Sequence, residues 1–353
     1  MNKTENVMIV FGGNSPEHEV SLRSAATIYR HIDRNLFNPI PVGMTRDGRF
    51  YRIAAPADGA DFVISPETCL GDPLSFTPGK PVCVGNDEIN FVFPIAHGAY
   101  GEDGRLQGFL EMLGLPYAGC RTVGSAVCMD KELTKRLCAA AGIPVVPFTV
   151  LRSAEEAAAE AAVSLGYPLV VKPVNAGSSR GVTKVKCESE LKAAVDEAFA
   201  FDTKVLLEQC VTARELECAV IGNGPFTVFP PGEVVSTHEF YDYDSKYRDS
   251  LSADLRLRAD LPEETSALIQ KYAGKAAEQC EVDGFARIDF FLDKNSGAVY
   301  LNEINTLPGF TSGSLFPLMC AENGIPITEI ITKIIRMGQE ESAKRFKFEP
   351  VTE

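Results

Sequence analysis

Apolar residues in the first third of the chain form short continuous runs. The first of these, at 7–11, is followed by two glycines and then by a helical pattern. Runs of this kind are typical of strands covered on both faces of a parallel sheet. The strands are predicted at residues 7–11, 39–43 and 89–94, and the helices at 21–32 and 105–113. The repeated order of strand, glycine-rich turn and helix predicts a doubly wound α/β domain with ligands at the carboxyl ends of its strands.

After about residue 120 the pattern changes to helices mixed with shorter strands, which predicts an α+β arrangement. The predicted helices are 125–141, 154–164, 188–199 and 263–280, and the predicted strands are 169–173, 182–185, 205–208, 216–221, 286–292 and 298–304. The stretch 236–258 is polar, rich in Tyr and Asp and without a regular period, so we expect a long mobile loop there. The charged tail from residue 338 is expected to be frayed.

The composition limits the class of protein. At about 150 residues per domain, a chain of 353 residues corresponds to two or three domains. Hydrophobic residues at 45% and charged residues at 23% are typical of globular proteins. The 34 Lys and Arg stand against 48 Asp and Glu, so the net charge is −14. This charge repels nucleic acid and anionic lipid, and a bound phosphate must therefore be met by local cations and backbone N–H groups.

The ten cysteines favour a reduced interior over a disulfide framework or a zinc site. They include no C-x-x-C pair, and the four histidines do not cluster. The chain shows no signal-peptide pattern and no apolar stretch near the roughly 18 residues that cross a membrane. We therefore expect a cytoplasmic protein whose thiols serve mostly as small packing residues.

The segment 285–311 (FARIDFFLDKNSGAVYLNEINTLPGFT) carries the densest candidate chemistry. Of two neighbouring predicted strands, one presents Asp289 and the other presents Glu303 and Asn305. A spacing of two places side chains on one face of a strand, so Arg287 shares the face of Asp289. Oxygen ligands of this kind suit Mg²⁺ that is shared with phosphate. The alternative is a salt-bridged outer face of the sheet, against which the apolar character of both strands argues.

Two lysines are candidates for binding phosphate. Lys172 ends a predicted strand just before the Gly/Ser turn at 177–181, whose N–H groups suit a phosphate. This segment is not a P-loop, because the lysine precedes the glycines and no G-K-[ST] follows. Lys131 in CMDK is the second candidate; the alternative for Lys131 is a solvated side chain on a helix.

A third segment is a candidate for binding the nucleoside. The predicted strand VLLEQCV contains Glu208 and Val211, whose backbone groups suit recognition of adenine. Glu215 follows, and its carboxylate suits the ribose hydroxyls. Recognition of this type needs only an extended strand edge, which many sequences supply.

In chain order these motifs resemble the D-alanine–D-alanine ligase family of the ATP-grasp superfamily, including its D-alanine–D-serine and D-alanine–D-lactate ligases. The matching segments are FGGNSPEHEVSL, HGAYGEDGRLQG, CMDK, VKPVNAGSSRGV, LLEQCV, FYDYDSKY, RID and NEINTLPGFTSGS. They cover nearly the whole chain. The resemblance implies three domains: an N-terminal α/β domain at 1–120, a central ATP-grasp subdomain at 121–211, and a C-terminal ATP-grasp subdomain at 212–345 with a lid loop at 236–258.

The resemblance implies roles around the first substrate. Glu17 would bind the ammonium group of the first D-alanine, and His97 would lie beside its carboxylate. Ser178 would link Glu17 to Tyr247 of the lid. Each also has a structural interpretation: Glu17 favours the positive end of the next helix, His97 is a turn residue, Ser178 bonds its own turn, and Tyr247 packs within its loop.

The resemblance also implies how the second half of the site is built. Arg287 and the N–H of Gly309 would stabilise the oxyanion of the tetrahedral intermediate. Ser314 and Leu315 would line the second subsite and receive the carboxylate of the second substrate. The implied reaction is attack of the first carboxylate on the γ-phosphorus of ATP, followed by attack of the second amine on the acylphosphate.

The cofactors and partners follow from the same resemblance. Lys131, Lys172 and Lys246 would contact the phosphates of ATP, with adenine and ribose near Glu208, Val211 and Glu215. Asp289, Glu303 and Asn305 would hold two Mg²⁺ ions, for which Mn²⁺ can substitute, and K⁺ would act as an activator. The implied partners are small molecules, with neither nucleic acid nor membrane, and the implied assembly is a homodimer formed through the first domain.

Two positions bear on the choice of second substrate. The pair Lys246-Tyr247 is typical of family members that join an amine, which argues against D-lactate. Leu315 is apolar, as is usual in housekeeping enzymes, whereas resistance-type relatives carry Arg there. The prediction is D-alanyl-D-alanine for peptidoglycan precursor synthesis, and the alternative is a D-alanine–D-serine ligase of the glycopeptide-resistance type.

Three other classes of protein fit less well. A nicotinamide-dependent oxidoreductase needs the glycines of G-x-G-x-x-G, which GGNSPE lacks. A non-catalytic nucleotide sensor would be expected to lose metal or oxyanion groups, yet all the candidates are present. Other ATP-grasp ligases would not be expected to keep both Glu17 and the Lys246-Tyr247 pair. An ADP-forming carboxylate–amine ligase is therefore the predicted enzyme.

Overall fold

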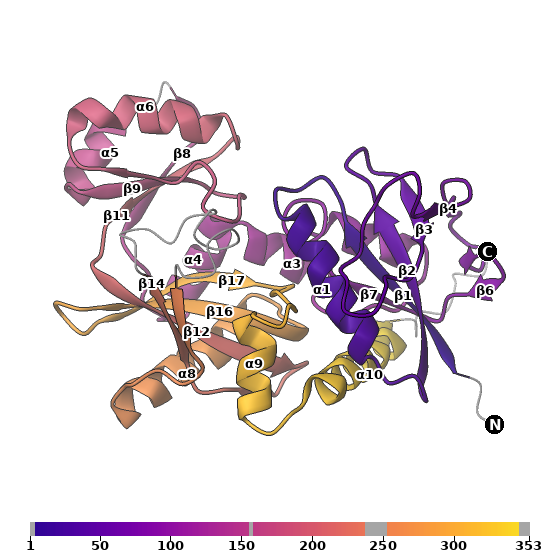
Figure 1. The fold of residues 1–353 in the computed structure, drawn as a ribbon. Helices are drawn as coiled ribbons and strands as arrows, with labels where there is room; N and C mark the ends of the chain where they lie inside the picture. Colours follow the sequence, from indigo (N-terminus) through magenta and orange to yellow (C-terminus); the bar gives the residue numbers. More distant parts are fainter. Residues whose placement is uncertain (1–3, 155–157, 237–252, 346–353) are drawn as a thin grey trace, which may run out of the picture.

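A computed structural model describes residues 4–154, 158–236 and 253–345 of the chain (Figure 1). Its first sheet has the strand order β4-β3-β2-β1-β7. Only the pairs β1–β2 and β1–β7 are parallel, and β3 and β4 extend the sheet with antiparallel pairing. The strands are β1 (Glu5–Gly12), β2 (Phe37–Met44), β3 (Phe50–Ile53), β4 (Cys69–Leu70) and β7 (Phe91–Pro94).

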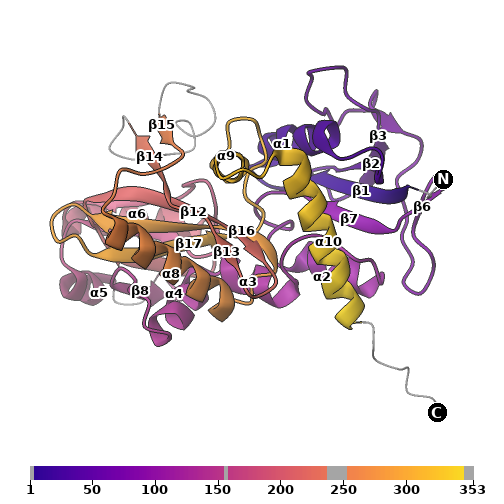
Figure 2. The ribbon, with the colours of Figure 1, turned by 90° about the horizontal axis from the view of Figure 1, so that it is seen from below.

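Helices cover both faces of this first sheet, as the continuous apolar strands predict. Helices α1 (His18–His31) and α10 (Ile327–Arg345) pack in one buried cluster with Val7 and Ile9, while α2 (Arg105–Met112) packs in another with Met8 and Val10. Figure 2 shows α1 and α2 on opposite sides of the sheet. The predicted doubly wound N-terminal unit is confirmed. Its antiparallel edge was not predicted, because residues 55–90 give little periodic signal.

The second sheet is antiparallel and has the order β10-β9-β11-β8. Helices α5 and α6 pack against it in a separate apolar cluster, and α3 and α4 lead into it from the first sheet. The elements are α3 (Thr122–Met129), α4 (Lys131–Ala140), β8 (Phe148–Leu151), α5 (Ala158–Leu165), β9 (Leu169–Pro173), β10 (Thr183–Val185), α6 (Glu188–Phe199) and β11 (Val205–Gln209).

The third sheet has the order β15-β14-β12-β16-β17, with β13 beside β12, and helix α8 packs on one face of it. Its elements are β12 (Ala213–Gly222), β13 (Thr227–Val228), β14 (Gly232–Ser236), β15 (Ala253–Arg256), α8 (Glu263–Gln279), β16 (Gly284–Asp293) and β17 (Val299–Asn305). The short hairpin β5 (Cys83–Val84)–β6 (Asp87–Glu88) and helix α9 (Leu315–Glu322) complete the described chain.

Three expectations from the sequence need correction. The single helix predicted at 125–141 is two helices, because Asp130 is extended (ψ 100°) and its side chain caps α4 by accepting from the N–H of Leu133. Strand β15 lies inside the predicted loop 236–258, while residues 237–252 of that loop are outside the described residues. The tail is helical as far as Arg345 rather than frayed from 338, because α10 inserts a buried stripe that includes Ile330 and Ile334 into the core.

Candidate active site

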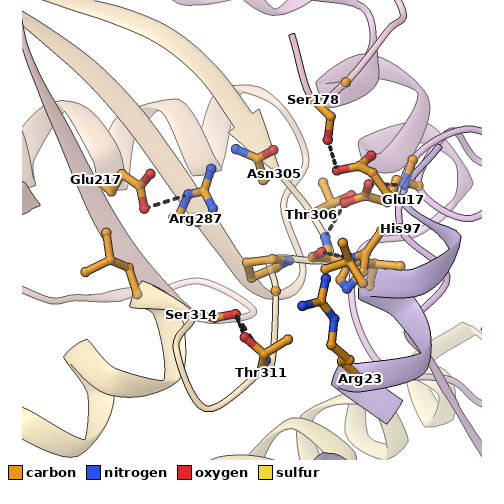
Figure 3. A pocket seen from close by; sticks show the side chains of 18 of the residues that line it. Glu17, Arg23, His97, Ser178, Glu217, Arg287, Asn305, Thr306, Thr311 and Ser314 are labelled. Atoms are coloured by element: carbon orange, nitrogen blue, oxygen red, sulfur yellow. Dashed lines mark hydrogen bonds and ion pairs between the residues drawn. The ribbon is translucent and has the colours of Figure 1, made fainter. Parts of the chain in front are cut away.

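A cavity of about 630 Å³ lies where elements of the three sheets meet (Figure 3). It is lined by the start of α1, the loop after β7, the junction of α3 and α4, the turn after β9, strands β12, β16 and β17, and the loop before α9. Ten of the predicted site residues line it: Glu17, His97, Lys131, Ser178, Arg287, Glu303, Asn305, Gly309, Ser314 and Leu315.

Glu17 lies at the carboxyl end of β1, immediately before α1. Ser178 donates a hydrogen bond of 2.6 Å to its Oε1, so the predicted contact between these two distant segments is present. A side chain at Gly98 would place its Cβ 2.7 Å from Oε2 of Glu17, and one at Gly177 would come within 3.0 Å. Both glycines are therefore needed where their backbones approach the carboxylate. The partner predicted beyond Ser178, Tyr247, lies outside the described residues, as does Lys246.

His97 is buried in the loop after β7, and both of its ring nitrogens have partners. Its Nδ1 lies 2.8 Å from the carbonyl oxygen of Leu307, and its Nε2 lies 2.9 Å from Oγ of Ser24. Because the carbonyl can only accept, Nδ1 carries the hydrogen and Nε2 accepts from the serine hydroxyl. Burial lowers the pKa of His97, although the charge of Glu17 opposes the shift. The ring is therefore neutral.

Glu102, in the same loop, is an acidic residue to which the sequence assigned no role. Its Oε2 accepts from the N–H of Gly98 at 2.5 Å, and its Oε1 accepts from the N–H of Leu307 at 3.1 Å. Burial, followed by the charge of Glu17, raises the pKa of Glu102 to about 8. This carboxyl group joins the loop after β7 to the loop that follows β17.

Arg287 lies on β16 between two carboxylates. Its Nε is 3.0 Å from Oε2 of Glu217 on β12, and its Nε and Nη2 bind Asp289 at 2.8 and 2.7 Å. Burial opposes the charge, but these carboxylates outweigh it and raise the pKa of Arg287 well above its usual value. Within the described part of the chain, Nη1 has no protein partner. The guanidinium therefore keeps donors for a group in the cavity.

The donor set predicted for metal fits a hard cation. In the register of β16 with β17, Arg287 faces Asn305 and Asp289 faces Glu303, as the spacing of two predicted. Asn305 donates to Asp289 at 3.0 Å, and Lys131 lies 3.4 Å from Glu303. Carboxylate and amide oxygens on adjacent strands are suited to Mg²⁺. Among the described residues, no three His, Cys, Asp or Glu side chains gather at one point.

The four-stranded sheet holds a buried charge cluster beside the cavity. Glu208 lies 2.5 Å from Nζ of Lys135 and 2.7 Å from Nζ of Lys172. Burial alone would raise the pKa of Glu208, but the two lysines outweigh it and lower it. Strand β11 lies between β8 and β9, so the backbone of Glu208 is inside the sheet rather than at an edge.

The loop between β17 and α9 shapes the far end of the cavity. A Cβ at Gly309 would lie 2.7 Å from Oγ of Ser314, and that hydroxyl also accepts from the N–H of Thr311 at 3.1 Å. In the described chain the N–H of Gly309 has no protein acceptor. Leu315, the first residue of α9, is buried and lines the cavity. The remaining predicted residues lie outside the lining: Lys172, Glu208, Val211, Glu215 and Asp289.

Comparison with protein families gives two matches that together cover most of the chain. A model described as the D-ala D-ala ligase N-terminus matches residues 6–120, and one described as the D-ala D-ala ligase C-terminus matches residues 137–336. The chain belongs to the D-alanine–D-alanine ligase family. The resemblance drawn from the motifs is confirmed, and with it an enzyme of the ADP-forming ligase class. Ligases of this family use ATP and a divalent metal ion.

Curated relatives match this ligase along nearly its whole length. The D-alanine–D-alanine ligase of Caldicellulosiruptor bescii is 40% identical, with 96% of each chain covered. D-alanine–D-alanine ligase A of Chromobacterium violaceum is 42% identical, with 95% of each covered.

Two solved structures support the ATP-grasp fold of this ligase. The D-alanine–D-alanine ligase from Coxiella burnetii has a TM-score of 0.84 and 33% identity, covering 98% of this chain and 96% of that one. The VanG D-Ala:D-Ser ligase from Enterococcus faecalis has a TM-score of 0.83 and 34% identity, covering 95% and 100%. No helix within the described residues is both long and apolar enough to cross a bilayer.

Reasoning from sequence missed four polar residues at or beside this site: Ser24, Glu102, Lys135 and Glu217. Glu217 had a detectable signal, because it lies two residues from Glu215 and so on the same face of the predicted strand; in the fold it faces Asp289 across the sheet. Glu102 belongs to a motif that was recognised, but one of the two backbone N–H groups that donate to it, that of Leu307, lies over 200 residues away. Ser24 and Lys135 look like ordinary helix residues until the fold buries them.

Proposed function

We propose that this ligase joins two D-alanines into D-alanyl-D-alanine, a peptidoglycan precursor, through a D-alanyl phosphate. The observation that carries the proposal is that one cavity gathers groups suited to each reactant. Its lining includes the Glu17–Ser178 pair, Arg287, Gly309 and the apolar Leu315, and among the described residues Nη1 of Arg287 and the N–H of Gly309 have no protein partner. These groups suit an ammonium group, a transferring phosphoryl group and a second small amino acid.

In the proposed first step, the chain binds and orients the first D-alanine. The carboxylate of Glu17 meets the ammonium group, and the carboxylate of D-alanine attacks the γ-phosphorus of ATP. The bond from this phosphorus to the β–γ bridging oxygen breaks, and ADP leaves. Lys131, Lys172 and Lys246 meet phosphate oxygens, and Val211 with Glu208 and Glu215 meets the nucleoside. Asp289, Glu303 and Asn305 would hold Mg²⁺, which supplies charge neutralisation at the phosphates. Because the chain carries a net charge of −14, binding of the phosphates depends on these local cations.

In the proposed second step, the amine of the second D-alanine attacks the carbonyl carbon of the acylphosphate. The developing oxyanion meets Arg287 and the N–H of Gly309, and the C–O bond to phosphate then breaks. Ser314 and the backbone of Leu315 receive the second carboxylate. The lid formed by 236–258, with Tyr247 near Ser178, would exclude water from the acylphosphate.

D-Serine as second substrate is the second candidate, because one of the two similar solved structures is a D-Ala:D-Ser ligase. The buried leucine at position 315 favours D-alanine, since an apolar wall gives a hydroxymethyl group no partner. Such a wall discriminates only weakly, by about tenfold to a hundredfold. We therefore expect some D-alanyl-D-serine at high D-serine concentration.

The test supplies ATP, Mg²⁺, K⁺ and D-alanine to the purified ligase and then adds D-serine or D-lactate in competition. We expect phosphate release that depends on D-alanine, and mass analysis that finds D-alanyl-D-alanine as the main product. Absence of D-alanine-dependent release would refute the proposal. A main product containing D-serine would assign the second candidate instead.

We propose further that the ligase is a cytoplasmic homodimer formed through the first domain, with domains at 1–120, 121–211 and 212–345. A cytoplasmic location matches a reaction that consumes ATP. Light scattering on the purified chain tests the assembly, and a monomer mass at micromolar concentration would contradict it.

A further inference from the structure

The loop between β17 and α9 is held by side chains from the opposite end of the sequence. Around Pro308 and Gly309, three backbone groups of this loop bond to the N-terminal part of the chain. The N–H of Leu307 donates to Glu102, the carbonyl of Leu307 accepts from His97, and the N–H of Phe310 donates to Ser24 at 3.1 Å. The backbone is therefore anchored at Leu307 and at the N–H of Phe310, on either side of the peptide unit that carries the N–H of Gly309, and that N–H is left for a ligand.

These contacts form one chain of hydrogen bonds with a single consistent direction. The N–H of Phe310 donates to Oγ of Ser24, and the Ser24 hydroxyl donates to Nε2 of His97. The Nδ1–H of His97 then donates back to the carbonyl of Leu307. This chain of hydrogen bonds thus begins and ends on the loop between β17 and α9. Ser24 and His97 are both buried, so water does not compete for these bonds.

Glu102 provides a second connection between the two loops. It binds the N–H of Leu307 and the N–H of Gly98, the residue next to His97. The carboxyl group thus fixes the spacing between the loop that carries His97 and the loop that carries Gly309. None of these bonds involves the side chain of Arg287 or of Glu17.

We propose that Ser24, His97 and Glu102 form a clamp that positions the N–H of Gly309 for the second half-reaction. The inference rests on the oxyanion role proposed above for Gly309, and it assigns positioning roles to Ser24 and Glu102, which act through the backbone N–H groups of Gly98, Leu307 and Phe310. The clamp acts on attack of the second amine, not on phosphorylation of the first carboxylate. A loosened clamp leaves the acylphosphate to form and then to be lost to water, which yields phosphate without dipeptide.

The diagnostic quantity is therefore the amount of phosphate released for each dipeptide formed. A variant that is only partly folded lowers both products equally and leaves this ratio unchanged. A variant with a misplaced Gly309 N–H raises the ratio, because hydrolysis competes with a slowed aminolysis. Mass analysis of total dipeptide, with D-alanine and D-serine both supplied, keeps the ratio readable whichever second substrate the ligase prefers.

Two substitutions remove different parts of the clamp. Ser24→Ala removes the acceptor of the Phe310 N–H and the donor to His97, and Glu102→Gln places an amide donor where two N–H groups need acceptors. For each we expect aminolysis to slow about tenfold and the ratio to rise at least about threefold over the wild-type ligase. Ser24→Thr keeps the hydroxyl and should stay close to the wild-type ratio.

Gln107 offers a matched control in the same region. It is buried, and its side chain donates to the carbonyl of Gly101 at 2.7 Å, so it braces the loop after β7 without touching residues 307–310. Gln107→Met should leave the ratio unchanged even if it lowers the melting temperature. An unchanged ratio in both Ser24→Ala and Glu102→Gln, or an equal rise in Gln107→Met, would overturn the clamp. A wild-type ligase that makes D-alanyl-D-serine would refute the proposed product and leave this test intact.

Discussion

Among the charge clusters in the described part of this ligase, two differ in which charge lies at the centre. At the cavity, Arg287 is the centre and the carboxylates of Glu217 and Asp289 surround it. Beside α4, Glu132 is the centre, with a 4% exposed side chain, and the cations Arg136 and Arg152 lie outside it with 61% and 57% exposed. Lys204 completes the second cluster by binding both Glu132 and Asp130.

The order of the charges separates a stabilising network from a reactive one. The buried carboxylate of Glu132 pairs with three cations, and the two arginines among them are exposed to solvent. The guanidinium of Arg287 has carboxylates on one edge and an uncommitted Nη1 at the cavity. The same residue types therefore hold a helix in one place and present a cation to a ligand in the other. Four predictions from three substitutions test this distinction, in decreasing order of expected effect.

Replacing the central cation of the cavity cluster should have the largest effect. For Arg287→Ala we expect dipeptide formation to fall by about 10³-fold, because the oxyanion loses its main positive partner. Binding of ATP, measured by calorimetry, should change much less. The matched control is Arg152→Ala in the other cluster, which should leave turnover unchanged. Turnover in Arg287→Ala within tenfold of the wild-type value would remove the proposed role of Arg287.

Replacing one surrounding carboxylate should have a smaller effect on the rate. Glu217→Gln keeps the size of the side chain but weakens the contact that orients the guanidinium, so we expect kcat to fall about tenfold to thirtyfold. Glu233→Gln is the control, because Glu233 pairs with Arg214 and Arg256 and lies outside the cavity lining. Equal losses of kcat in both variants would show that a general effect on the sheet, not the position of Arg287, is being measured.

The cluster beside α4 should respond in stability rather than in rate. Glu132→Gln leaves three cations without their central carboxylate, and we expect the free energy of unfolding to fall by about 3 kcal/mol. The value of kcat at 25 °C should stay within about twofold. Urea unfolding and steady-state kinetics on the same preparation check both parts. A large loss of kcat with normal stability would contradict the assignment of this cluster.

The same cluster should produce a dependence of stability on acid. Burial opposes the charge of Glu132, but Arg152, Lys204 and Arg136 outweigh it and lower its pKa to about 2. The folded carboxyl thus binds protons less readily than the unfolded one, so its contribution is complete above about pH 4.5 and is lost as the pH falls towards 2. The difference in unfolding free energy between wild type and Glu132→Gln should shrink over that range. A difference that stays constant with pH would be evidence against this pairing.

Local signals in the sequence predict much of this molecule. The continuous apolar strand 7–11, the glycines after it and the spacing of two between Glu303 and Asn305 each have a short-range physical cause, and each is confirmed in the fold. The contact of Ser178 with Glu17 followed from the family resemblance, not from either residue alone. Ten of the predicted residues line one cavity, as expected when the motifs of a family occur in that family's order along the chain.

The rest depends on contacts between segments far apart in the chain. Ser24 and Glu102 accept from backbone N–H groups of residues 307–310, and no periodicity in one strand or helix reports on a donor more than 200 positions away. Likewise, Glu208 looks like a strand residue at an edge, whereas pairing on both sides places it inside a sheet. The break at Asp130 was missed because the helical period continues across the cap.

The measurement that tests the account most directly follows the carboxylate oxygens of the first substrate. D-Alanine labelled with ¹⁸O in its carboxylate is supplied with ATP and Mg²⁺, and the released phosphate is analysed by mass. If the carboxylate attacks the γ-phosphorus in this cavity, the bridging oxygen leaves with phosphate when the amine displaces it, and each phosphate formed with a dipeptide carries one labelled oxygen. Unlabelled phosphate released in step with dipeptide would contradict the acylphosphate and, with it, the roles proposed for Arg287 and Gly309.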